Sequence, residues 1–170
     1  MSVATDIVEF ACKLKPRQAT LVPEKRQEIT TEGGLDVAGN PKRIKTALEE
    51  LQKEGIEVSL FIDPDKRQID AAKKIGVKLI ELHTGRYAEA KGDKEEAKFL
   101  NEIKTAASYA RSKGLRVFAG HGLDYSNVTK IAAIKNIEEL NIGYSIICRA
   151  VIVGLEHAVK EMKALIEFKG

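Results

Sequence analysis

Two histidines that follow apolar runs are the residues of this sequence best suited to chemistry. His121 stands between Gly120 and Gly122, directly after an apolar run that begins at Arg116. The two glycines let the backbone turn sharply and let a ligand come close to it. Because an imidazole titrates near neutral pH, the pattern predicts a proton-transferring group at the end of a strand. The alternative is a turn histidine with a structural role.

A carboxylate and a second histidine occupy the corresponding place one unit earlier. The apolar run from Leu79 carries Glu81 and His83 and ends at Gly85. A carboxylate inside an apolar strand is costly unless it is used or paired, so Glu81 is a second candidate for the reacting site. A structural ion pair is the alternative for Glu81. For His83 the sequence leaves open a role supporting the site residues and plain placement at a strand end.

Strands and helices must position these groups. In the sequence, apolar runs alternate with helical patterns, and no hairpin signal lies between them. This alternation predicts parallel strands joined by crossover helices, so both titratable groups reach the same edge of a sheet. We expect strands at residues 19–23, 56–62, 77–83, 116–120 and 140–143. We expect helices at residues 5–14, 41–53, 63–76, 93–113, 128–132, 144–151 and 154–168, the third of them capped by Asp63 and Pro64.

Two architectures accept this order of elements. A doubly wound open sheet needs about five strands and is complete at this length. A (β/α)8 barrel has eight strands and about 250 residues, so this chain would hold only its last five units. The tail favours the barrel, because a strand followed by Gly143 and a short helix from Tyr144 is how barrels bind phosphate after their last strand. The backbone N–H groups of these two residues would face the anion, helped by the helix dipole.

Composition and charge exclude several classes of function. The chain has 170 residues, 44% of them hydrophobic, which predicts one domain over residues 1–170. Its 28 basic and 25 acidic residues form no basic run interleaved with aromatics, so no nucleic-acid partner is expected. No apolar run reaches membrane-spanning length, and the first residues given lack the basic and apolar regions of a signal peptide, so we expect a cytoplasmic protein without a membrane partner. Cys12 and Cys148 are expected to be buried reduced thiols rather than a disulfide or a metal pair.

Five segments along nearly the whole chain match a known family in its order: LVPEKRQEITTEGGLDVAG, VSLFID, IELHTGRYA, AGHGLDY and ELNIGYSIICRAV. In these segments the chain resembles the pyridoxine 5'-phosphate synthases, which close the pyridine ring of vitamin B6. The resemblance implies a TIM barrel and the condensation of 1-deoxy-D-xylulose 5-phosphate with 3-amino-2-oxopropyl phosphate, releasing phosphate and water. It implies phosphorylated small-molecule substrates and a homo-oligomer, and it implies no cofactor or metal.

The resemblance also implies roles for single residues. His121 matches a histidine that donates a proton, and Glu81 matches a carboxylate that stabilises charge in the transition state. Thr30 matches a contact to the deoxyxylulose phosphate. Three further positions match contacts to the amino-ketone phosphate: Gly122, Gly143 and Tyr144. The family often carries histidine at the last of these positions, so the role implied there is that of the backbone N–H.

The front of the chain departs from the family's pattern. The family's first three strands carry a catalytic histidine, a catalytic glutamate and phosphate-binding arginines, and Met1 aligns just after that glutamate. The chain is therefore expected to lack these groups, to be inactive by itself, and to associate through open sheet edges.

Two other functions fit parts of the sequence. A complete doubly wound sheet would be a non-catalytic module that binds a phosphate ligand. A different phosphate-handling barrel enzyme, such as an isomerase or aldolase, is the other alternative. The aldolase version is weakened because no lysine holds a central strand position, where a Schiff-base nucleophile would be expected.

Overall fold

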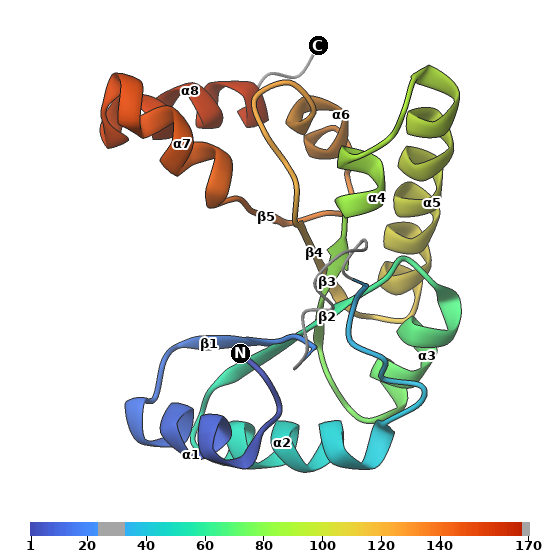
Figure 1. The fold of residues 1–170 in the computed structure, drawn as a ribbon. Helices are drawn as coiled ribbons and strands as arrows, with labels where there is room; N and C mark the ends of the chain where they lie inside the picture. Colours follow the sequence, from blue (N-terminus) through green and yellow to red (C-terminus); the bar gives the residue numbers. More distant parts are fainter. Residues whose placement is uncertain (24–32, 168–170) are drawn as a thin grey trace.

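A curved sheet of parallel strands forms the centre of the protein, in a computed structural model that describes residues 1–23 and 33–167 (Figure 1). The five strands pair in the order β1-β2-β3-β4-β5, and every pairing is parallel. They are β1 (Gln18–Leu21), β2 (Glu57–Ile62), β3 (Leu79–His83), β4 (Arg116–Gly120) and β5 (Glu139–Asn141). Because sequential neighbours pair throughout, the sheet is a half-barrel, and the doubly wound alternative, which requires a reversal of strand order, is wrong.

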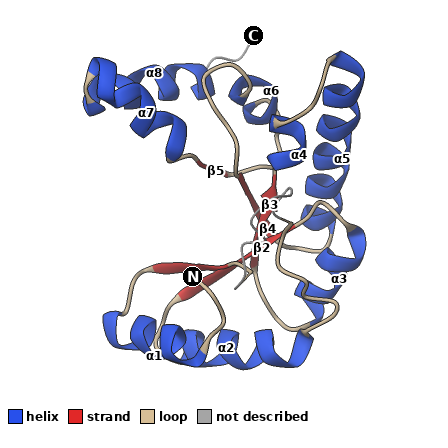
Figure 2. Cartoon of the chain, in the orientation of Figure 1, coloured by secondary structure: helices blue, strands red, loops and turns tan. Residues whose placement is uncertain are grey.

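Helices lie before, between and after the strands (Figure 2). They are α1 (Thr5–Leu14), α2 (Pro41–Lys53), α3 (Lys66–Lys74), α4 (Gly85–Ala88), α5 (Asp93–Ser112), α6 (Val128–Ala132), α7 (Tyr144–Val153) and α8 (Leu155–Glu167). The expected helices are confirmed, whereas the short α4 was not predicted, because Gly85 resembles the end of a strand rather than the start of a helix.

The start of α3 differs from the prediction for a physical reason. The helix is capped by Asp65, whose carboxylate accepts a hydrogen bond from the Arg67 N–H at 2.8 Å. Asp63 cannot serve as the cap, because its carboxylate is held by the His83 imidazole and by the Gly34 N–H. The residue that the sequence assigned to a helix cap therefore belongs to the edge of the sheet where the candidate site lies.

The outer face of the sheet and the helices share one apolar core. Alternate strand residues such as Leu60, Ile80 and Val117 are buried there. They pack against helix residues of the same cluster, among them Ile44, Leu48, Leu51, Ile69 and Ile103. Side chains in a strand alternate between its two faces, so the residues between these face the concave side.

The concave face carries a different set of side chains. The strand register aligns Phe61, Glu81 and Phe118 in one row across β2, β3 and β4. The next row toward the carboxyl ends aligns His83 with Gly120 and Asn141. Polar and aromatic groups are therefore gathered on the inner face, next to the carboxyl edge of the sheet.

The last two helices differ from the others in their surroundings. None of the residues of α7 is buried, and its apolar side chains Ile147, Val151 and Ile152 are exposed. Cys148 on this helix is an exposed free thiol and Cys12 is a half-buried one, so the prediction that both are buried is wrong. The apolar sequence around Cys148 faces outward instead of into a core. In the part of the chain that the structure describes, no helix has the length and apolar character needed to cross a membrane.

Candidate active site

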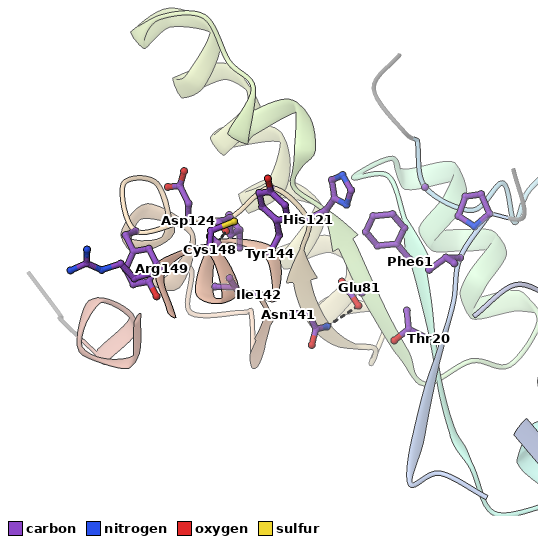
Figure 3. A pocket seen from close by; sticks show the side chains of 18 of the residues that line it. Thr20, Phe61, Glu81, His121, Asp124, Asn141, Ile142, Tyr144, Cys148 and Arg149 are labelled. Carbon is purple, nitrogen blue, oxygen red and sulfur yellow. Dashed lines mark hydrogen bonds between the residues drawn. The ribbon is translucent and has the colours of Figure 1, made fainter. Parts of the chain in front are cut away.

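A cavity of about 1510 Å³ lies at the concave face, at the carboxyl ends of the strands (Figure 3). Residues from every strand or from the loop after it line this cavity, and so does the start of α7. Five of the six residues singled out from the sequence are among them: Glu81, His121, Gly122, Gly143 and Tyr144. The sixth, Thr30, lies outside the described residues.

Glu81 reaches the cavity from the middle of β3 and is largely buried, with 7% of its surface exposed. Its Oε2 accepts a hydrogen bond from Asn141 Nδ2 at 2.7 Å. Burial raises the pKa of Glu81, and the hydrogen bond from Asn141 opposes that rise. A side chain at Gly120 would collide with Oε1 of the carboxylate, so the glycine on β4 provides the space that Glu81 occupies.

His121 stands just past the end of β4 in a backbone conformation that side chains rarely adopt. Its φ is +84°, in the left-handed region, which costs roughly 1–3 kcal/mol for a residue with a side chain. The hydroxyl of Thr84 holds this turn, because its proton is shared between the carbonyls of Gly120 at 2.7 Å and His121 at 2.6 Å. The strained turn carries the imidazole out of the sheet and onto the exposed rim of the cavity.

His83 lies behind the cavity rather than in its wall. Its Nδ1 lies 3.0 Å from Oδ1 of Asp63, and its ring packs edge to face with those of Phe61 and His121. The hydrogen bond with His83 lowers the pKa of Asp63, which outweighs the opposite effect of burial. The pair borders a second cavity of about 350 Å³, which Arg86 also lines.

The start of α7 provides backbone donors at the other side of the larger cavity. Gly143 caps this helix, and the first N–H groups of a helix have no partner within it, so they suit an anion. The Ser145 hydroxyl donates to the carbonyl of Leu123 at 2.8 Å, which ties the helix start to the loop after His121. Tyr144 is 87% exposed.

The only basic lysine or arginine side chain among the described cavity residues is that of Arg149. Its guanidinium is bound by both carboxylate oxygens of Glu161, at 2.7 and 2.9 Å. A cation already paired in this bidentate way contributes little free charge to an incoming phosphate. The backbone N–H groups at the start of α7 therefore remain as anion donors that no side-chain carboxylate occupies.

Sequence reasoning missed three residues of this site. Asn141 was predicted only as part of a short strand, Asp63 was predicted only as a helix cap, and Thr84 was given no role. Each acts through a hydrogen bond to a residue at least 20 positions away in the chain. The available signal was a polar side chain at a strand end, which by itself does not identify the partner.

Comparison with known proteins gives one family and several close relatives. The model of the family described as pyridoxal phosphate biosynthesis protein PdxJ matches residues 1–168. Pyridoxine 5'-phosphate synthases from the Coxiella burnetii strains Dugway 5J108-111, RSA 331 / Henzerling II and RSA 493 / Nine Mile phase I are each 59% identical over 166 residues. Each match covers 98% of this chain and 69% of the relative.

Comparison of structures supports the fold alone. The crystal structure of a xylose isomerase domain protein from Planctomyces limnophilus superposes with a TM-score of 0.57 at 14% identity. The match covers 97% of this chain and 69% of that one. At this identity the likeness extends to the α/β half-barrel and not to the reaction.

Proposed function

The chain belongs to the PdxJ family of pyridoxal phosphate biosynthesis proteins, whose function is that of a pyridoxine 5'-phosphate synthase, and we propose that the larger cavity holds its reaction. The proposed substrates are 1-deoxy-D-xylulose 5-phosphate and 3-amino-2-oxopropyl phosphate, and the proposed products are pyridoxine 5'-phosphate, inorganic phosphate and water. The observation that supports this most is the convergence of Glu81, His121 and the start of α7 on one cavity.

His121 is the proposed proton donor. The amine nitrogen of one substrate attacks the ketone carbon of the other, and the former carbonyl oxygen leaves as water once it has been protonated. The resulting imine loses phosphate. A carbon–carbon bond then closes the ring at the ketone carbon of the amino ketone, whose oxygen is protonated and leaves as a second water. An imidazole at the cavity rim can exchange its proton with solvent between these steps, because His121 is exposed.

Glu81 is proposed to stabilise positive charge on the nitrogen as the imine forms. The carboxylate is buried, which raises its pKa, and it accepts a side-chain hydrogen bond from Asn141, which opposes that rise. A cationic nitrogen beside it would be favoured, because a charge in a low-dielectric site interacts strongly with an opposite charge. Asn141 keeps the carboxylate in one orientation for this contact.

Phosphate groups are proposed to bind at two places. The backbone N–H groups of Gly122, Gly143 and Tyr144 would hold the phosphate of the amino ketone, with the helix dipole of α7 behind them. Thr30, which lies outside the described residues, is the proposed contact to the deoxyxylulose phosphate.

The proposal includes one domain in a cytoplasmic protein. One apolar core extends from Val3 to Ile134 in the described chain, which supports a single cooperative unit over residues 1–170. Both cysteines are free thiols, which agrees with a reducing compartment. A single calorimetric unfolding transition is expected, and two separate transitions would contradict one domain.

Association of copies is a further part of the proposal. The exposed apolar side chains on α7, with Phe10 and Leu14 on α1, are typical of surfaces that another chain covers. We expect sedimentation to give a mass well above the 18.7 kDa of one chain. A monomer at micromolar concentration would contradict this.

The direct test is a ring-closing assay that measures pyridoxine 5'-phosphate from the two proposed substrates. It is run on the chain alone and on the chain mixed with the part of a Coxiella burnetii relative that it does not match, since it covers 69% of that protein. Product formed in either assay and lost in His121→Ala supports the proposal. No product in both, or full activity in His121→Ala, overturns it.

A further inference from the structure

His83 is a buried histidine that the proposed reaction does not use. Its side chain is 3% exposed, yet Nε2 has no hydrogen-bond partner among the residues that the structure describes. A buried polar atom without a partner is costly, so it is retained only where something else depends on it. The groups that surround the ring indicate what depends on His83.

Asp63 fixes the orientation of the His83 ring. Because the hydrogen bond lowers the pKa of Asp63, its carboxylate is ionised near neutral pH and can only accept. Nδ1 of His83 therefore carries the proton, and the ring cannot flip without losing this contact. Oδ1 of Asp63 also accepts from the Gly34 N–H at 3.0 Å, so the carboxylate is itself held at the end of β2.

The His83 ring lies against the ring of His121. The two ring centroids lie 4.9 Å apart at an interplanar angle of 66°, and the Phe61 ring lies 4.9 Å from His83 and 6.0 Å from His121. A methyl group added at Gly85 would come within 2.6 Å of His83 Nε2 and 3.2 Å of His121 Cδ2. The glycine thus leaves the space in which the two imidazoles approach each other.

We propose that His83 is a positioning residue, which Asp63 orients and which supports the His121 imidazole at the cavity rim. Thr84 holds the backbone of His121 from the same strand end, so the neighbouring positions 83 and 84 restrain its ring and its carbonyl. The inference deepens the proposed function, because it assumes the chemical role of His121. A displacement of about 1 Å in a reacting group can cost roughly 10²-fold in rate, which gives such support a measurable effect.

Two variants test the contributions of Asp63 and His83 separately. Asp63→Asn keeps the shape of the side chain but removes its charge, and His83→Phe keeps an aromatic ring but removes both nitrogens. Asp65→Asn, on the exposed cap of α3, is the matched control for the first. His157→Phe, on the exposed face of α8, is the matched control for the second.

The closing experiment records nitrogen-15 spectra of the imidazoles in the chain itself, which contains three histidines. We expect a proton on Nδ1 of His83, and we expect Asp63→Asn and His83→Phe each to change the His121 ring signals while both controls leave them unchanged. Unchanged His121 signals in folded Asp63→Asn or folded His83→Phe would overturn the positioning role. If His83→Phe does not fold, Asp63→Asn decides alone.

Kinetics then distinguish this inference from the proposed function. In an assay where the unaltered chain turns over, each of the two variants is expected to lower kcat at least tenfold and leave KM within about twofold. An unchanged kcat would overturn the inference with the proposed function intact. Absence of turnover by the unaltered chain, both alone and mixed with the unmatched part of the relative, would contradict the proposed function, while the spectra still test the contact between the rings.

Discussion

The two faces of the same five strands have opposite compositions. The outer face presents residues such as Leu60, Leu82 and Val117 to the helices and is apolar throughout its core. The concave face presents Glu81 and Asn141, and these polar groups reach a large cavity. Buried polar groups reduce stability unless they are paired, whereas apolar burial increases it. We therefore assign the stability of the fold to the outer face and the chemistry to the inner face. Variants on the two faces can test this division.

The largest expected effect is that of His121→Asn on turnover. General acid catalysis contributes about 10²–10⁴-fold, so kcat should fall within that range. Asparagine tolerates the positive φ of this position, so the midpoint of thermal unfolding should stay close to that of the unaltered chain. Steady-state kinetics and a thermal scan on the same sample check both halves. If the variant unfolds at a lower temperature but keeps its kcat, His121 supports the fold, as the outer-face residues do, and not the reaction.

An outer-face variant should behave in the opposite way. Leu82→Ala removes a fully buried side chain from β3 and should lower the free energy of unfolding by roughly 2–5 kcal/mol. Urea denaturation measures the change, with Lys104→Ala on the exposed side of α5 as the control, where a change within about 0.5 kcal/mol is expected. Equal losses in the two variants would mean that the helix-covered face is not the main source of stability.

Thr84→Val should affect both properties moderately. The variant keeps the branched shape but removes the hydroxyl that binds the carbonyls of Gly120 and His121. The Gly120 carbonyl keeps a hydrogen bond from the Thr84 backbone N–H at 2.9 Å, whereas the His121 carbonyl loses the hydroxyl. A part-buried acceptor that loses its donor costs about 1–3 kcal/mol, so the free energy of unfolding should fall by about that amount. Turnover should fall as well, because the strained turn at His121 loses its restraint. An unchanged unfolding midpoint in Thr84→Val would show that this hydroxyl does not hold the turn.

The smallest effect is expected for Glu81→Gln, and it is an increase in stability. The pKa of Glu81 is raised in the folded state, so as pH rises the carboxyl group loses its proton first in the unfolded chain. The free energy of unfolding therefore falls as pH rises from about 4.5 through the folded pKa. Glutamine removes this loss, and the variant should be the more stable protein at pH 7. Below pH 4 the two should converge. Denaturation curves at both pH values test this, and a variant less stable at pH 7 would contradict it.

Asp63 should show the opposite dependence on pH. Because the pKa of Asp63 is lowered in the folded state, its contribution to stability is present above the unfolded value and is lost as pH falls through the folded pKa. Asp63→Asn should therefore be less stable than the unaltered chain near neutral pH, and the difference should shrink in acid. Acid titration of both proteins followed by circular dichroism measures it.

The alternation of strand and helix patterns was enough to predict a parallel α/β sheet, because hydrophobic periodicity and helix ends are local properties. The choice of the half-barrel over the doubly wound sheet needed the glycine and short helix after the last strand, together with the family resemblance. The same reading placed Glu81 and His121 at one sheet edge, since parallel strands end on the same side. The contact between Asn141 and Glu81 could not be predicted, because it depends on the register between strands 60 residues apart. The exposure of Cys148 was missed because an apolar run does not reveal which helix face a core will cover.

The most direct test of the central claim is a phosphate titration followed by backbone amide spectra of the chain. If the concave face carries the site, inorganic phosphate should shift the amides of Gly122, Gly143 and Tyr144 together, with one dissociation constant. Outer-face amides such as those of Leu60 and Val117 should stay unchanged. Shifts confined to other surfaces, or no shifts at millimolar phosphate, would contradict the assignment of chemistry to this cavity.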